Sequence, residues 1–351
     1  MPPTRRRLLL GAAATLATPH IARAARRRMT VGAFDDVFQT NYEQAVVEPF
    51  RRAHPDIDVS YYPVTNSEQL VSLLRMSRAG PPVDVALLEL TAARGATMIG
   101  VLAPLSREMP EFAGVPAGMF IPGVAGLPVM IDCLAIAYAP ARVVPPPRAW
   151  RALWEQNVGG PITLNAAPDP AGLAFTLVAN ALFGSENYQK SFAGGIDAIR
   201  LIAPRVVTWY PLPDVYGAII DGVASLGVAW NARGQMLAGT RLGEGKLAMA
   251  LPREGSVPQV ITINLAAGSR IPDAARAFIA YTLSPEAQQA TATRLFYGPV
   301  NSAGLVPPAV LARTAAAPDQ RERMMEVDWT RVMEMSDDIT REWRRRIIPH
   351  R

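Results

Sequence analysis

The sequence predicts an α/β fold in two lobes, and three observations lead to this prediction. Strand-like and helix-like segments alternate from residue 29 onward, an order typical of a parallel sheet covered by helices. Residues 83–88 form an almost continuous apolar run, as expected of a strand buried on both faces. The alternation continues through the second half without a low-complexity linker. We therefore expect the chain to cross between the lobes more than once.

The first half of the chain supplies a β-α-β-α-β series, followed by a loop and a long strand. The series consists of strands at 29–34, 57–62 and 83–88 and helices at 42–53 and 67–77. Residues 101–128 are rich in Pro, Gly and Met and are expected to form a loop. The apolar run at 130–138 then predicts a strong strand.

The second half repeats the alternation with shorter segments. Strands are expected at 161–165, 206–211, 227–231, 246–251 and 260–265. Helices are expected to begin at 150–154 and to occupy 173–182 and 273–283, and the charged segment 307–351 is expected to be helical.

Residues 1–24 have the pattern of an export signal. A basic head at residues 4–7 precedes an apolar run at 8–17, and a small-residue cleavage box, Ala-Arg-Ala, occupies 22–24. The paired arginines match the twin-arginine variant, although general secretory signals also carry them. A basic nucleic-acid-binding arm is the alternative, but it needs neither the apolar run nor the box. We therefore expect a periplasmic protein, cleaved near Ala24.

Charge and hydropathy limit the partners of the mature chain. Removing residues 1–24 takes away four arginines and no acidic residue, which lowers the formal net charge from +5 to about +1. The remaining charge therefore gives no indication of nucleic-acid binding. No later apolar stretch approaches the roughly 18–20 residues of a membrane helix. We expect a monomer without a membrane span.

The cysteine and histidine content argues against catalysis and metal binding. Cys133 is the only cysteine and sits in an apolar strand-like run. His54 and His350 are the only histidines after the signal, so Ser67 or Ser225 would lack a credible base. A zinc site of the usual His/Cys type is equally unsupported. We expect no cofactor, no metal and no enzymatic activity; an exported enzyme on the same scaffold is the alternative.

Several segments, in their order and spacing, resemble a known family. They are Trp150-x-x-Leu153-Trp154, Ala229-Trp230-Asn231, residues 251–255, residues 274–279, residues 283–288 and Tyr297-Gly298-Pro299-Val300-Asn301. Over about residues 29–303 the chain resembles a type II periplasmic solute-binding protein of an ABC importer. It is most similar to the spermidine/putrescine-binding branch and its iron- and phosphonate-binding relatives.

The resemblance implies the type II periplasmic-binding-protein fold, in which two lobes close around a small solute. It also implies delivery of the solute to the permease subunits of an ABC transporter. We expect residues 25–130 plus 262–303 to form the N-terminal lobe. Residues 131–261 plus 304–351 are expected to form the C-terminal lobe.

Ligands of open α/β sheets bind beyond the carboxyl ends of the strands, which points to the loops after Phe34, Pro63, Leu88, Asn165 and Trp230. By resemblance, Phe34 takes the place of an aromatic residue that stacks on the ligand. Trp230 offers a flat wall for apolar stems or cations. The expected ligand-binding residues are Phe34, Asp35, Asp36, Thr65, Asn66, Glu89, Asp169, Trp230, Asn231 and Gln259.

Most of these residues also have a structural alternative. An aspartate at 35, 36 or 169, or Asn66, can cap the following helix. Trp230 can pack in the core, and Glu89 can pair with Arg94. Asp132, inside an apolar strand, needs a partner, which is either the ligand or an arginine.

Trp209, Tyr210, Asp214 and Tyr216 form a second candidate group of aromatic and acidic residues. Arg233 would suit a carboxylate or phosphonate ligand. Its Gly-rich surroundings instead predict an ordinary surface loop.

One departure from the polyamine binders bears on the ligand. Where those proteins carry a Trp-x-Asp that grips the amine, this chain has Gln259 and Ile261. This favours an amino-acid derivative, a phosphonate or another small organic molecule over a polyamine. A ferric-iron receptor is a further alternative, but Tyr61 and Tyr62 alternate along a strand and cannot both face one cleft.

Overall fold

The structure is a computed structural model that describes residues 27–155, 159–301 and 305–348. The expected export signal at 1–24, with its cleavage site near Ala24, lies outside the described residues.

The strands form one mixed sheet in the order β2-β1-β3-β10-β5-β8-β6-β7, with β4 on β10 and β9 on β5. The strands are β1 (Arg27–Phe34), β2 (Ile57–Val64), β3 (Val85–Glu89), β4 (Leu102–Ala103), β5 (Leu127–Tyr138), β6 (Ile162–Thr163), β7 (Val206–Thr208), β8 (Leu226–Trp230), β9 (Ala248–Ala250) and β10 (Pro258–Ala266).

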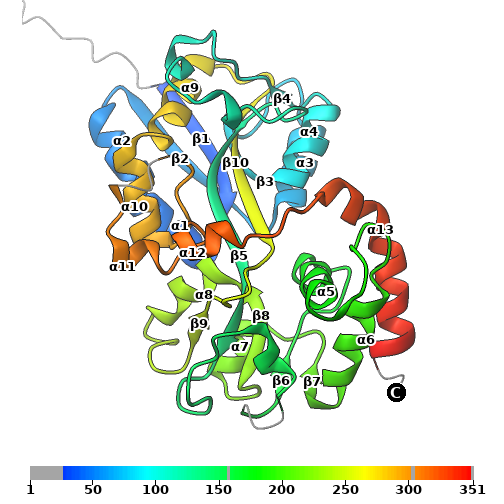
Figure 1. The fold of residues 1–351 in the computed structure, drawn as a ribbon. Coiled ribbons are helices and arrows are strands. Elements are labelled where there is room, and N and C mark those ends of the chain that lie inside the picture. Colours follow the sequence, from blue (N-terminus) through cyan, green and yellow to red (C-terminus); the bar gives the residue numbers. More distant parts are fainter. Residues whose placement is uncertain (1–26, 156–158, 302–304, 349–351) are drawn as a thin grey trace, which may run out of the picture.

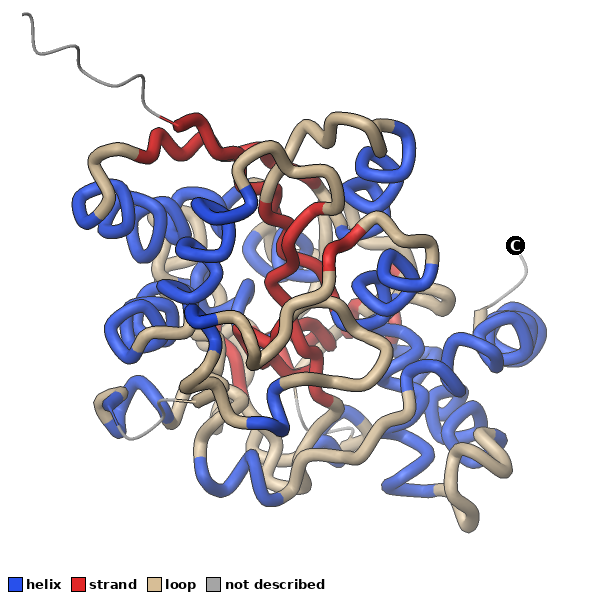
Figure 2. The backbone as a smooth tube through the Cα atoms, turned by 90° about the horizontal axis from the view of Figure 1, so that it is seen from above, coloured by secondary structure: helices blue, strands red, loops and turns tan. Residues whose placement is uncertain are grey.

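Helices surround this sheet, as Figure 2 shows in the view from above. They are α1 (Asp36–Tyr42), α2 (Glu48–Ala53), α3 (Ser67–Met76), α4 (Leu90–Met98), α5 (Pro170–Phe183), α6 (Ala193–Ile202), α7 (Val215–Ile220), α8 (Asn231–Ala238), α9 (Pro272–Thr282), α10 (Pro285–Leu295), α11 (Pro308–Leu311), α12 (Pro318–Glu322) and α13 (Trp329–Glu342). A π-helical turn at Glu43–Val47 joins α1 to α2, so the helix expected at 42–53 is present but begins earlier.

Two parallel sets of strands give the molecule two lobes (Figure 1). β1 pairs in parallel with β2 and β3, and β6 pairs in parallel with β7 and β8. Between the two sets lies β5, which pairs with β10 over Leu127–Cys133 and with β8 over Leu134–Tyr138. A single strand therefore runs from one lobe into the other, and the predicted two-lobed α/β fold is confirmed.

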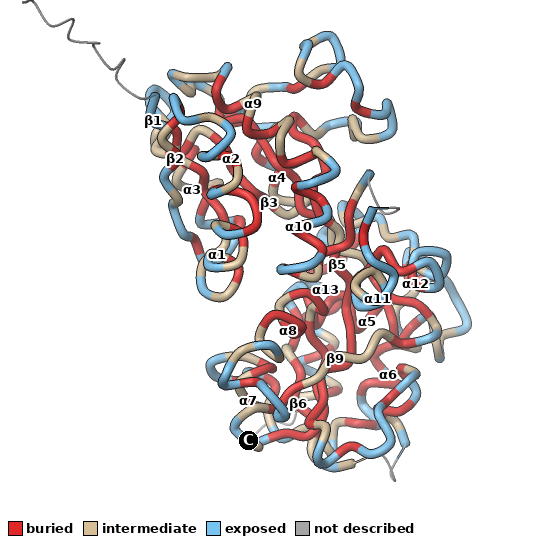
Figure 3. Tube along the Cα trace, turned by 90° about the vertical axis from the view of Figure 1, so that its left-hand side faces the viewer, coloured by how far each residue is buried: buried red, intermediate tan, exposed pale blue. Residues whose placement is uncertain are grey.

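Each lobe has its own apolar core, visible in Figure 3 as two groups of buried residues. In the first lobe the Phe50 and Phe278 rings meet edge to face, with centroids 5.0 Å apart. In the second lobe Trp343, which follows α13, packs edge to face on Trp209 and donates from its indole nitrogen to Thr176 Oγ1 at 2.9 Å. The C-terminal segment is therefore part of the second lobe's core.

Helix α8 connects the two lobes. It follows β8 of the second lobe, yet Ala232 and Met236 belong to the core of the first lobe. The helix packs against α1 and α10. An element of the second lobe thus reaches across the boundary beside the point where β5 crosses it.

Two segments differ from the sequence expectation. The loop expected at 101–128 contains β4 and the start of β5, because Leu127 already pairs with β10. The helix expected to begin at 150–154 is one 3₁₀ turn, Trp150–Leu153.

Candidate functional site

A cavity of about 600 Å³ lies between the lobes, and both lobes contribute to its lining. Its walls come from the ends of β1, β2 and β3 on one side and from the ends of β6 and β8 and the start of α7 on the other. Eight of the ten expected residues line it: Phe34, Asp35, Thr65, Asn66, Glu89, Asp169, Trp230 and Gln259.

Asp36 and Asn231 are placed differently. The Asp36 carboxylate pairs with Arg233 at 3.0 Å instead of lining the cavity. Asn231 is fully buried, and its amide nitrogen donates to the carbonyl of Arg313 at 2.9 Å. Its side-chain oxygen accepts from Gln235 at 3.2 Å. Both polar ends of Asn231 are therefore committed to the protein itself.

The loop after β1 presents an aromatic ring and a carboxylate to the cavity. Phe34 packs edge to face on Phe38, with centroids 5.3 Å apart. Asp35 stands at the N-cap position of α1, but its side chain makes no capping bond and instead accepts from Thr65 Oγ1 at 3.3 Å. Asp36 follows with φ 57°, a left-handed conformation that is uncommon outside glycine.

Two expected site residues serve as helix caps as well as lining the cavity. Asn66 Oδ1 accepts from the backbone of Gln69 at 2.9 Å and caps α3. Asp169 Oδ1 accepts from the backbone of Ala171 at 2.8 Å and caps α5. Burial raises the pKa of Asp169, partly offset by its hydrogen bonds, which include one with the Asn165 side chain.

Glu89 ends β3 and is bonded to the neighbouring strand β10. The Gln259 amide donates to Glu89 Oε1 at 3.0 Å. Burial, which is the largest cause, and the negative charges of Glu68 and Asp169 together raise the pKa of Glu89 to about 7. The alternative partner, Arg94, instead donates to Thr330 at 3.2 Å.

Asp132 finds its partner in a helix terminus. It is fully buried on β5, and its two carboxylate oxygens accept from the backbone N–H of Ala232 at 3.0 and 3.1 Å, in the first turn of α8. One oxygen also accepts from Cys133 N at 2.8 Å. Burial raises the pKa of Asp132 to about 7, against the lowering effect of these bonds. The partner is neither of the two that the sequence suggested.

Arg233 lies on α8 and lines the cavity, so the surface loop expected there is wrong. Its guanidinium bonds Asp36 at 3.0 Å and Asp214 at 3.1 Å, which links the two lobes. Gly234, which suggested a loop, instead packs closely on Met249: a Cβ added there would lie 2.2 Å from the Met249 sulfur.

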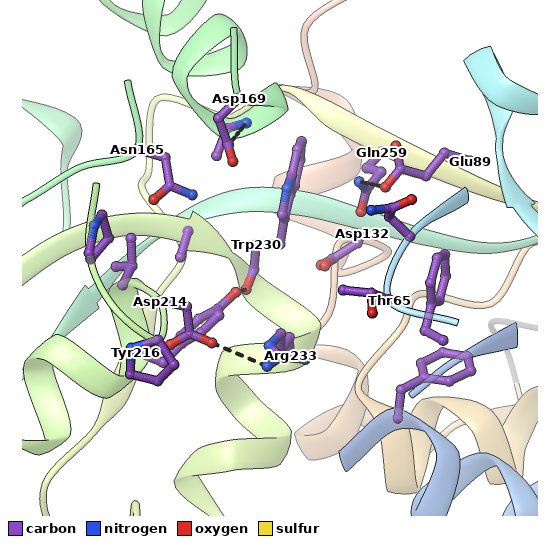
Figure 4. Close-up of a pocket in the computed structure, with 18 of the residues that line it drawn as sticks. Thr65, Glu89, Asp132, Asn165, Asp169, Asp214, Tyr216, Trp230, Arg233 and Gln259 are labelled. Carbon is purple, nitrogen blue, oxygen red and sulfur yellow. Dashed lines mark hydrogen bonds and ion pairs between the residues drawn. The ribbon is translucent and has the colours of Figure 1, made fainter. Parts of the chain in front are cut away.

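The second aromatic and acidic group also lines the cavity: Trp209, Tyr210, Asp214 and Tyr216. Asp214 caps α7 by accepting from Gly217 N at 2.8 Å. The Tyr216 hydroxyl donates to the carbonyl of Trp230 at 2.6 Å, which holds the end of β8 (Figure 4). The sequence predicted this side of the cavity only from the clustering of aromatic and acidic residues.

The cavity carries an excess of acidic groups. Five lining residues are carboxylic acids: Asp35, Glu89, Asp132, Asp169 and Asp214. Arg233 is the one lysine or arginine among the lining residues that the structure describes, and it is already bonded to two aspartates.

Neither a metal-binding cluster nor a membrane-crossing helix occurs among the described residues. Within residues 27–155, 159–301 and 305–348, no three His, Cys, Asp or Glu side chains are grouped to hold a metal ion. Tyr61, considered for iron, donates its hydroxyl to the carbonyl of Phe34 at 2.5 Å. Over the same residues, no helix combines the length and apolar character needed to cross a bilayer.

Comparisons with known proteins agree with this architecture. Residues 45–318, more than half of the chain, match the family described as bacterial extracellular solute-binding protein. None of the curated proteins matches the chain.

Solved structures of low sequence identity share the fold. A substrate-binding protein of an ABC transporter from Bradyrhizobium japonicum USDA 110 is 16% identical, with a TM-score of 0.76 over 92% of this chain and 100% of that chain. An ABC transporter from Clostridium perfringens ATCC 13124 is 18% identical, with a TM-score of 0.69 over 91% and 100%. The PBP AgtB from A. tumefaciens R10, in complex with agropinic acid, is 17% identical, with a TM-score of 0.69 over 92% and 99%.

These matches are to binding proteins and not to enzymes. They do not single out the spermidine/putrescine branch, so that finer resemblance stays a prediction. By the match over residues 45–318, the chain belongs to the bacterial extracellular solute-binding proteins.

Proposed function

We propose that the protein captures a small organic solute in the cavity between its lobes and delivers it to the permease of an ABC importer. The observation that carries this proposal is the cavity of about 600 Å³, lined by side chains of both lobes. Its size falls within the range typical of small-molecule sites. The proposed contacts are the eight expected residues that line it.

We further propose that the protein acts in the periplasm and closes its lobes around the solute. The export signal at 1–24 would take the protein to the periplasm, where it acts as a monomer. The proposed lobes are residues 25–130 plus 262–303 and residues 131–261 plus 304–351. Bending at β5 and β10 would close the lobes around the solute, a hinge motion common among such receptors.

The affinity for the solute would come from enclosing it in the cavity between the lobes. A solute that displaces water from Trp230, Phe34 and Tyr216 gains from the burial of aromatic surface. The surrounding polar groups then fix its orientation, because a buried polar group without a partner costs free energy.

The test is the thermal unfolding of the protein against a panel of amino acids, amines, phosphonates, sugars and ferric citrate. A solute at about 100 times its dissociation constant should stabilise the fold by about 2.7 kcal/mol, a shift of a few degrees. Trp230→Ala should abolish the shift. Tyr62→Ala, at a partly exposed aromatic outside the cavity, should keep it. No shift with any solute, or conversion of a solute to product, would contradict the proposal.

A further inference from the structure

A second cavity, of about 370 Å³, adjoins the first on the other side of Trp230. It lies between the N-terminal ends of α3 and α4 in one lobe and α5 and α13 in the other. Its lining is largely apolar and includes Leu90, Pro170, Leu173, Val260, Trp329 and Met333. A space of this kind between the lobes suits an apolar group that leaves water.

Three side chains separate the two cavities. Glu89, Trp230 and Gln259 line both of them. In the view of Figure 4 the Trp230 ring stands between Asp169 and the Glu89–Gln259 pair. One side-chain hydrogen bond, from Gln259 to Glu89 at 3.0 Å, joins two members of this partition. A solute group that competes with Gln259 for the Glu89 carboxylate would therefore weaken this hydrogen bond and loosen the partition.

The charges of the first cavity favour a cation there. Among the described residues that line it, five are carboxylic acids, and the one arginine, Arg233, is bonded to Asp36 and Asp214. An anionic solute would face this acidic wall with no unengaged arginine or lysine among the described lining residues. A cationic solute would supply a countercharge where water is displaced and charge interactions strengthen. Trp230 adds an aromatic face that attracts cations.

We propose that the solute is an elongated organic cation that occupies both cavities. Its charged group lies in the acidic cavity beside Glu89, and its apolar part passes the Glu89–Trp230–Gln259 partition into the second cavity. This rests on the proposed function, because it names the class of solute that the same cleft binds.

Four matched probes separate the two parts of the proposal: phenylbutylamine, phenylbutyrate, phenylbutanol and butylamine. Calorimetric titration at neutral pH and low salt should show phenylbutylamine binding at least about tenfold tighter than either uncharged phenylbutanol or anionic phenylbutyrate. It should also bind at least about tenfold tighter than butylamine, which lacks the apolar part.

Two variants locate the groups. Glu89→Gln should weaken both amines by a similar factor. Met333→Gln, in the second cavity, should weaken phenylbutylamine several-fold and leave butylamine unchanged. Met98→Gln replaces an exposed methionine outside both cavities and should change neither.

The outcomes distinguish this inference from the proposed function. Tighter binding of phenylbutyrate or phenylbutanol would overturn the cationic class and leave the receptor role intact. Equal binding of both amines, with Met333→Gln silent, would overturn the role of the second cavity. Failure of all four probes overturns this inference, and the receptor role falls with it only if the broader solute panel also gives no shift.

Discussion

Asp132 is a fully buried carboxylic acid whose described hydrogen-bond donors are all backbone N–H groups. The N-terminal end of α8 carries partial positive charge, which favours the ionised form there. Burial outweighs this effect and raises the pKa of Asp132 to about 7 from 3.8. The folded protein therefore keeps this proton over a pH range in which the unfolded chain has released it.

This difference predicts a pH dependence of stability. Below about pH 4 the ionisation of Asp132 does not change the free energy of unfolding. Between about pH 4 and pH 7 that free energy falls as the pH rises, and above about pH 7 the effect of Asp132 is constant. The difference between the pKa of Asp132 in the folded protein and in the unfolded chain corresponds to about 4 kcal/mol. Asp132→Asn keeps an acceptor oxygen and removes the titration. The free energy of unfolding of the wild type, measured with urea, should therefore fall relative to this variant by up to about 4 kcal/mol across that range.

Asp319→Asn, at an exposed aspartate on α12, is the matched control and should follow the wild-type curve. Parallel curves for wild type and Asp132→Asn would show that burial does not raise the pKa of Asp132 in the folded state.

The raised pKa of Glu89 predicts that the protein releases or takes up a proton when a charged solute binds. Its pKa of about 7, raised mainly by burial, leaves it part protonated at neutral pH. A cation bound beside it would lower that pKa and release a proton, whereas an anion would raise it and take up a proton. Titration of phenylbutylamine in buffers of different ionisation enthalpy should thus show proton release. The release should disappear in Glu89→Gln, and proton uptake by the wild type would contradict a cation beside Glu89.

At the scale of elements, α7 and α8 depend on aspartates placed at their first turns. Asp214 accepts from Gly217 N and also pairs with Arg233. Asp214→Ala removes both interactions and should cost about 1–2 kcal/mol in the free energy of unfolding. Asp214→Asn keeps a capping oxygen and loses only the partly exposed ion pair, so its cost should stay below about 1 kcal/mol. Equal losses in urea unfolding would show that the cap contributes nothing.

The long strands were predictable from sequence, and their bounds differ from the expectation by a few residues. β5 and β10 lie in the middle of the sheet with neighbours on both edges, and β5 shows this burial as a long apolar run interrupted by Asp132. The edge strand β7 ends at Thr208, three residues before the expected limit, since its run continues into a loop that lines the cavity. Apolar content alone does not separate such a loop from a strand.

The site was predictable as far as the strand ends, and no further. Phe34, Glu89 and Trp230 follow from the rule that ligands lie beyond the carboxyl ends of strands. The partner of Asp132 does not, because Ala232 is 100 residues away and contributes a backbone N–H, which no residue type reveals. Arg233 was considered but assigned to a surface loop because glycines surround it, whereas Gly234 serves close packing on Met249.

At the scale of the whole molecule, the two lobes turn the ends of their strands toward each other, and both cavities lie between them. β5 crosses the boundary, and the bond from Arg233 to Asp36 spans it. A solute bound between the lobes contacts both, so its binding free energy is available to change their relative position.

The claim that solute binding changes the relative position of the two lobes is tested most directly by measuring distances between them. Cys133, the only cysteine, is fully buried, so cysteines introduced at exposed sites accept spin labels selectively. One pair is Met76→Cys with Val223→Cys, and a second pair is Met98→Cys with Leu201→Cys, because one pair alone can lie near the hinge axis. With a panel solute that stabilises the fold, pulsed electron spin resonance should show a new interlobe distance in at least one pair, with the solute recovered unchanged. Identical distances in both pairs with every such solute, or a solute recovered as product, would contradict a receptor that closes on its ligand.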